Sequence, residues 1–191
     1  VGEESVDEER RTVRMALVAL NNLESASVNI VRLRDELLAE VREAFPSNGP
    51  AMAQLIACVS ELQATAQRFS TALEDVLSTV GKQLQPRLRT TVADLLSIDK
   101  HSSIYLLDEA GYQATQSSSF MPWSVRLTSF LDELLLPYSP GPHGLCESNS
   151  RTLLCAVASY VGKRLLVMLR QQRFSQLGGM QLDKDVRTVI A

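Results

Sequence analysis

Two histidines, His101 and His143, are the residues that could most readily act as catalytic bases. Each occurs in a stretch without helical periodicity, and no Gly-x-Ser-x-Gly turn is present nearby to expose a nucleophilic serine. A base that acts in catalysis is normally held on a rigid element. We therefore expect no catalytic residue in this chain and predict that it is not an enzyme.

A metal site is suggested superficially by His143, Cys146 and Cys155. A structural zinc site usually draws its ligands from two close pairs, and the chain offers no second pair, so we predict no metal. Cys58 and Cys155 are interpreted instead as small residues of the core.

The sequence Gly162-Lys163-Arg164 has a distant similarity to the end of a phosphate-binding loop. That loop needs a glycine five residues before its second glycine, and Val157 occupies this position. We therefore expect no nucleotide, and no other cofactor is indicated.

One set of charged residues exceeds what an ordinary surface would show, because five basic residues and no acidic one lie between Ser148 and Leu182. Lys163 and Arg170 are seven positions apart and so share a helix face. The simpler interpretation is a solvated face whose counter-charges lie on a neighbouring helix. The functional interpretation is an electropositive docking surface for anionic lipid head groups or for an acidic partner helix. The set comprises Arg151, Lys163, Arg164, Arg170 and Arg173.

The elements that would position these residues are predicted to be helices. Of the 191 residues 45% are hydrophobic, and 19 Lys and Arg face 22 Asp and Glu, which gives a formal charge of -3. This balance disfavours a nucleic-acid partner. Glycine and aromatic residues are too few for an all-β sandwich. We therefore expect an all-α chain.

Residues 1–97 predict a long helical hairpin. No Gly or Pro occurs from Val13 to Phe45, and apolar residues recur at steps of three and four. Pro46 to Pro50 should end this helix and start a second one, which reaches about Ser97 with a bend near Gly81 and Pro86.

Residues 98–121 are predicted to form an irregular loop, and within it the segment from Gly111 to Ser119 is expected to be mobile. Residues 122–191 predict further helices of the same bundle, one opened by Pro122 and a central one from about Ser148 to Phe174. Asp183 is expected to cap a last helix, which the end of the sequence cuts off at residue 191. The predicted fold is an elongated antiparallel helical bundle, truncated before its C-terminal helices.

The compartment can be predicted from cysteine usage and from the apolar stretches. Three cysteines and the absence of an Asn-x-Ser/Thr glycosylation site fit a reducing cytosolic setting. The richest apolar stretch, Thr152 to Gly162, has eleven residues, whereas about 20 are needed to cross a bilayer. We therefore expect no membrane span.

A resemblance to a known family is found in the stretch from Phe174 to Ala191. Its core, Leu-Gly-Gly-apolar-Gln-x-Asp-Lys, closely resembles subunit 4 of the conserved oligomeric Golgi complex. The segments Asn22-Leu23-Glu24-Ser25 and Pro122-Trp123 are also similar to that family in order and spacing, whereas the Pro-rich segment Pro137 to Gly144 departs from it. The core residues are Leu177, Gly178, Gly179, Met180, Gln181, Asp183 and Lys184.

The resemblance implies a helical-rod tethering protein, related to exocyst and Dsl1 subunits, that catalyses nothing. It implies a peripheral complex on the cytosolic face of the Golgi that captures vesicles carrying recycled glycosylation enzymes in retrograde transport. The implied partners are the other subunits of the complex, SNARE proteins or small GTPases, and the Golgi membrane. Gly178 and Gly179 are carried over as a corner between two helices, where a residue with positive φ is needed.

An alternative from a different class is a regulatory helical adaptor. Such a protein would bind one small GTPase or one amphipathic helix in a groove, without belonging to a permanent complex. The size of the native assembly would separate the two hypotheses.

Overall fold

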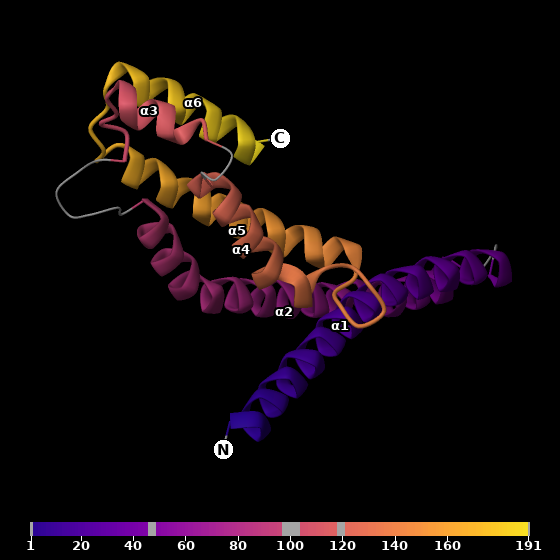
Figure 1. Ribbon diagram of the computed structural model, residues 1–191. Coiled ribbons are helices and arrows are strands. Elements are labelled where there is room, and N and C mark those ends of the chain that lie inside the picture. The colour runs from indigo at the N-terminus through magenta and orange to yellow at the C-terminus, as the bar shows by residue number, and fades with distance from the viewer. Residues whose placement is uncertain (1, 46–48, 97–103, 118–120, 191) are drawn as a thin grey trace. The chain divides into compact units, whose positions relative to one another are not determined.

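The computed structural model describes residues 2–45, 49–96, 104–117 and 121–190. These residues form six α-helices and one short 3-10 helix, and no β-strand occurs among them (Figure 1). The predicted all-α class is confirmed. The elements are α1 (Gly2–Ala44), α2 (Gly49–Leu96), α3 (Glu109–Thr115), α4 (Trp123–Leu135), η1 (Leu136–Tyr138), α5 (Glu147–Leu169) and α6 (Gln176–Ile190).

The chain divides into two compact units. Unit 1 comprises Val1–Val80 and Tyr138–Leu153, and unit 2 comprises Gly81–Pro137 and Leu154–Ala191. The long helices α2 and α5 each contribute residues to both units.

In unit 1, α1 and the first part of α2 pack side by side and antiparallel. The Ser27 hydroxyl donates to the Ala66 carbonyl at 3.2 Å, and Arg34, further along α1, bonds to Gln63, which lies earlier on α2. Ala66 is only 2% exposed. Its small side chain allows the backbones of α1 and α2 to approach closely here, and this close approach buries it. Leu17 and Leu20 of α1 are buried in the same unit.

Asn21 of α1 makes two hydrogen bonds to the Pro-rich segment before α5. Asn21 donates from Nδ2 to the Gly144 carbonyl at 2.9 Å and accepts at Oδ1 from the Cys146 amide at 2.9 Å. Leu145, between these two anchored residues, is 1% exposed. Backbone polar groups that leave water need such partners, so Asn21 fixes where this segment lies.

In unit 2, the segment predicted to be an irregular loop contains the helix α3. Asp108 precedes it, and its carboxylate accepts from the Gly111 amide at 2.7 Å, as expected of an N-cap residue. The helix has seven residues, too few for the apolar periodicity on which the loop prediction relied. The capping residue was the signal that could have revealed it.

The helix that follows the Pro-rich segment ends five residues earlier than predicted. α5 stops at Leu169 instead of Phe174, and the Phe174 ring stacks on Tyr105 with 5.3 Å between the ring centroids. The prediction for the two core cysteines is wrong, since both Cys58 and Cys155 are exposed. Both lie in helices whose apolar residues extend beyond the buried stripe, so apolar neighbours in sequence did not indicate burial.

Among the described residues, α5 alone has the length and composition that would allow a helix to cross a membrane. Its most apolar 18-residue stretch has a mean hydropathy of 1.6, and 22% of that stretch is buried. A core helix of a soluble protein can have the same length and composition, so this is weak evidence for a membrane span. It does show that α5 exposes apolar side chains.

Candidate functional site

The residues of the family-like core lie in α6, where they form the first turns of one helix. The structure corrects the predicted corner, because Gly178 and Gly179 are both inside α6 and Asp183 lies in its middle. The helix begins earlier because the Ser175 hydroxyl accepts from the Gly178 amide at 3.1 Å and so caps its N-terminus. Asp183 pairs instead with Arg187, one turn on, at 2.8 Å.

Gly178 is required by close packing rather than by a positive φ. A Cβ at this position would overlap the Tyr105 carbonyl oxygen and would lie 2.6 Å from its carbon and 3.0 Å from its Cα. The backbone at Tyr105 is held here because its carbonyl accepts from the Ser175 amide at 2.9 Å. The segment before α3 thus lies directly against the start of α6.

A buried polar network holds α6 to α4 and to this segment. The Trp123 indole donates to the Tyr105 hydroxyl at 2.5 Å, and that hydroxyl donates to Asp185 at 3.0 Å. Gln181 donates to the other oxygen of the Asp185 carboxylate at 2.9 Å. Burial raises the pKa of Tyr105 and of Asp185, although the hydrogen bonds from Gln181 and Tyr105 oppose the increase at Asp185.

Gln181 and Lys184 of the family-like core also attach α6 to α3 and to the residue that follows it. The Gln181 side-chain oxygen accepts from Thr115 at 3.1 Å and from Gln116 at 3.3 Å. Lys184 donates to Gln116 at 2.7 Å, and its ammonium lies 5.3 Å from the centre of the Tyr112 ring. These residues therefore make structural contacts, and the core positions three elements of unit 2 around α6.

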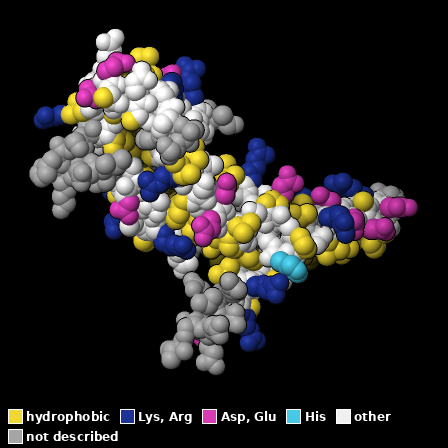
Figure 2. Space-filling view, in the orientation of Figure 1, with side chains coloured by type: hydrophobic (Ala, Val, Ile, Leu, Met, Phe, Trp, Pro, Cys, Tyr) yellow, Lys and Arg dark blue, Asp and Glu magenta, His cyan; other side chains and the backbone are white. Residues whose placement is uncertain are grey.

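The basic residues predicted as a docking face are divided between the two units. Arg151 belongs to unit 1, whereas Lys163, Arg164, Arg170 and Arg173 belong to unit 2. All are exposed except Arg164, which is half-buried. The Arg164 Nε is buried and has no hydrogen-bond partner among the described residues. On the face shown in Figure 2, basic and acidic side chains are interspersed among hydrophobic ones, so charge of one sign gathers only locally.

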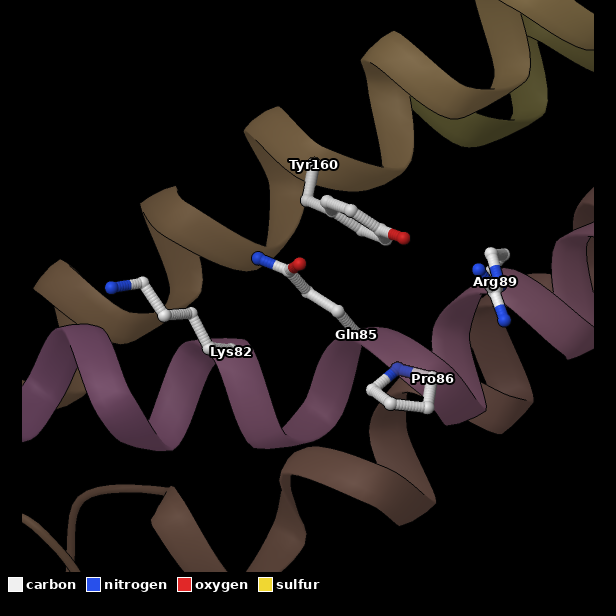
Figure 3. Close-up of a pocket in the computed structure, with 5 residues that line it drawn as sticks. All are labelled: Lys82, Gln85, Pro86, Arg89 and Tyr160. Carbon is white, nitrogen blue, oxygen red and sulfur yellow. The ribbon is translucent and has the colours of Figure 1, made fainter.

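Sequence reasoning missed a polar hollow in unit 2, between the second part of α2 and α5. In Figure 3 the Tyr160 ring extends from α5 above Gln85 and towards Arg89, while Lys82 stands at the other end of the row on α2. Lys82, Gln85 and Arg89 have the spacing i, i+3 and i+7, which could have identified a shared helix face. The hollow itself could not be predicted from these residues of α2, because Tyr160 of α5 forms its other side.

The described residues provide no arrangement typical of catalysis or of a metal site. They contain no group of three or more His, Cys, Asp or Glu side chains that could hold a metal. His143 is exposed in unit 1, and His101 lies outside the described residues. The Cys146 thiol donates to the Glu24 carboxylate. Burial is the main cause that raises the pKa of this thiol, and the bond to Glu24 raises it further. A raised pKa disfavours the reactive thiolate. The described residues form helices that leave charged and large apolar side chains exposed.

Comparison with known proteins identifies the family. A family model described as the C-terminal region of conserved oligomeric Golgi complex subunit 4 matches residues 16–191. The chain belongs to this family, as the resemblance in residues 174–191 predicted. The adaptor alternative is not favoured.

Curated relatives with the same description come from plants and animals. Conserved oligomeric Golgi complex subunit 4 of Arabidopsis thaliana is 29% identical over 174 residues, covering 91% of this chain and 22% of the relative. The Bos taurus and Homo sapiens proteins are 26% and 25% identical over 195 residues, covering 100% of this chain and 23% of each relative. The chain thus spans less than a quarter of the length of these relatives.

Proposed function

We propose that this chain is part of a non-enzymatic structural subunit of a Golgi vesicle-tethering complex. The observation that carries the proposal is the family match over residues 16–191, together with relatives named as subunits of the conserved oligomeric Golgi complex. The protein would act in retrograde transport within the Golgi and so maintain the glycosylation enzymes there. It would work on the cytosolic face of the membrane as a peripheral component.

The contacts within the chain are compatible with a role in assembly. Its buried polar groups are used to hold helices together, as Gln181 and Asp185 do in α6. Large apolar side chains remain exposed on helix faces, among them Met15 at 64% and Val28 at 61% on α1. Exposed apolar faces suit binding to other proteins, so we assign them to the other subunits of the complex, and to SNARE proteins or small GTPases.

The basic residues of unit 2 form the proposed docking face. Arg170 directly follows the end of α5, and its amide continues the helical pattern by bonding to the Leu166 carbonyl at 3.1 Å, so it lies on the same side as Lys163. No acidic residue interrupts the stretch from Ser148 to Leu182. This face would attract anionic partners, in addition to the apolar contacts.

The proposal is tested by removing this region from the full-length protein in cells. We expect the protein without it to lose its place in a large assembly, the complex to leave the Golgi, and glycosylation to become defective. Sedimentation of the native complex, microscopy and lectin staining measure these three effects. Normal assembly and normal glycosylation in such cells would contradict the proposal.

A further inference from the structure

The polar hollow of unit 2 combines two cations with two neutral hydrogen-bond donors. Lys82, Gln85, Pro86 and Arg89 line it from α2, and Tyr160 lines it from α5 (Figure 3). Their polar groups are an ammonium, an amide, a guanidinium and a phenol, all of which can donate. None of the lining residues is acidic.

The charges around the hollow have no counter-ions among the described residues. Lys82 and Arg89 form no ion pair within this part of the chain. On α5, Lys163 and Arg164 follow Tyr160 by three and four positions, so they lie one helical turn further on the same side. Arg164 also has its buried Nε without a partner in the described region, and buried polar groups normally have one. The hollow therefore carries a positive potential.

The size of the hollow limits what it can enclose. Its volume is about 170 Å³, whereas pockets that enclose a whole small molecule have about 300–1,000 Å³. An anionic group of limited size would fit, with the rest of the ligand remaining outside. Phosphate groups are recognised by clustered Lys and Arg donors, and Arg can bind two phosphate oxygens at once.

The surface beside the hollow favours a membrane lipid over a phosphorylated peptide. Lys163 and Val167 follow Tyr160 at i+3 and i+7 on one stripe of α5, and Val167 and Leu166 are 47% and 50% exposed. Basic residues next to exposed apolar ones are typical of helices that lie in the interface of an anionic membrane.

We propose that this hollow is a binding site for the phosphomonoester head group of an anionic membrane lipid. The phosphate contacts Lys82, Arg89 and Tyr160, and Leu166 and Val167 contact the bilayer surface. A phosphomonoester carries more charge than the diester of an ordinary anionic lipid, so a hollow lined by two cations, Lys82 at one end and Arg89 at the other, favours it. The proposal rests on the proposed peripheral membrane role.

The test uses the full-length protein in its native complex and vesicles of three compositions. These are phosphatidylcholine alone, phosphatidylcholine with phosphatidylserine, and phosphatidylcholine with a phosphatidylinositol monophosphate at the same total charge. We expect the third to bind on the order of tenfold more tightly than the second. The double variant Lys82→Gln/Arg89→Gln should lose affinity on the order of tenfold for the third composition.

A matched control removes the same charge elsewhere. Arg11 and Arg14 are exposed on α1, in unit 1, and the variant Arg11→Gln/Arg14→Gln should bind as the wild type does. Tyr160→Phe, which keeps the ring and so the packing, should weaken binding to the monophosphate vesicles and leave binding to phosphatidylserine unchanged.

Each of the following results would overturn the proposal: equal binding to both anionic compositions, unchanged affinity in the Lys82→Gln/Arg89→Gln variant, or tighter binding to a phosphopeptide than to the monophosphate vesicles. Assembly of the complex is measured by sedimentation in the same preparations. An assembled wild type that ignores the monophosphate vesicles overturns the lipid site alone. A wild type that does not assemble overturns the proposed function.

Discussion

Two adjacent glycines of α6 have very different surroundings. A Cβ at Gly178 would overlap the backbone of Tyr105, whereas a Cβ at Gly179 would meet no atom within 4 Å. Close approach therefore explains the need for glycine at the first position only. The same residue type can be essential or replaceable depending on what packs against it.

The alanine variants of these glycines should have opposite effects. Gly178→Ala forces the Tyr105 segment away from α6 and should reduce the free energy of unfolding by about 1–3 kcal/mol. Gly179→Ala should leave it unchanged or raise it by up to about 1 kcal/mol, because alanine favours the helix. Urea unfolding of both variants measures this, and equal destabilisation would contradict the role of close packing.

Tyr105 connects Trp123 and Asp185 through one hydroxyl, and removing it takes away a hydrogen bond from the buried Trp123 indole and one from the Asp185 carboxylate, which keeps its bond from Gln181. We expect Tyr105→Phe to reduce the free energy of unfolding by about 1–3 kcal/mol. The control is Tyr112→Phe, whose ring still faces Lys184 and whose stability should be close to that of the wild type. A Tyr105→Phe variant as stable as this control would show that the network contributes little.

Asp185 should make the stability of unit 2 depend on pH. Burial raises the pKa of its carboxyl above the usual value of 3.8, so the folded chain binds the proton more tightly than the unfolded chain. Its contribution to stability is therefore greatest at low pH and is lost as the pH rises from 3.8 through the raised folded pKa. The variant Asp185→Asn has no proton to lose at this position, so the wild type should lose stability relative to this variant as the pH rises. Thermal unfolding of both proteins between about pH 4 and pH 8 measures the difference, and a difference that does not change with pH would contradict the raised pKa.

Among the elements, the segment between η1 and α5 depends on a helix far away in the sequence. Two of its backbone groups bond to Asn21 of α1. A segment with three prolines and two glycines between residues 137 and 144 forms no regular ladder of its own, so α1 supplies the fixed partner.

Replacing that partner should loosen the segment. We expect Asn21→Ala to reduce the free energy of unfolding by about 1–3 kcal/mol and to speed hydrogen exchange at the Cys146 amide. Asn22→Ala, at an exposed neighbouring position, is the control and should leave this exchange unchanged. Unaltered protection of Cys146 in Asn21→Ala would mean that other contacts hold the segment.

At the scale of the whole molecule, the proposed function depends on surfaces and not on a reactive site. The stabilising contacts described above lie within each unit, while basic side chains of α5 remain exposed. Changes to an exposed face usually alter stability by about 0.5 kcal/mol or less, so binding can be altered without unfolding.

Reversing three charges on the proposed docking face tests this separation. Lys163→Glu, Arg170→Glu and Arg173→Glu together should weaken binding to anionic vesicles or to the partner subunits on the order of tenfold or more. The thermal midpoint should change little. The control reverses Arg11, Arg14 and Arg42 of α1 in the same way. Equal effects of both triple variants would show that net charge, and not this face, determines binding.

Local patterns in the sequence were sufficient for the all-α class and for the start of α4 after Pro122, because helical periodicity and proline effects involve only neighbouring residues. The family was also predictable, from the stretch that begins at Phe174. The C-terminal end of α5 and the short helix α3 were not, since a helix can end before its apolar pattern does and seven residues show too little periodicity.

Only the tertiary structure decided what the family-like core does. Tyr105 and Asp185 are 80 positions apart, and Gly178 contacts a backbone whose place no local pattern predicts. The polar hollow likewise needs α2 and α5 together. Local sequence patterns determined the longer helices because hydrogen bonds within a helix join residues four apart. Which residues meet across helices depends on how the whole set of side chains packs, and that was decided by the fold.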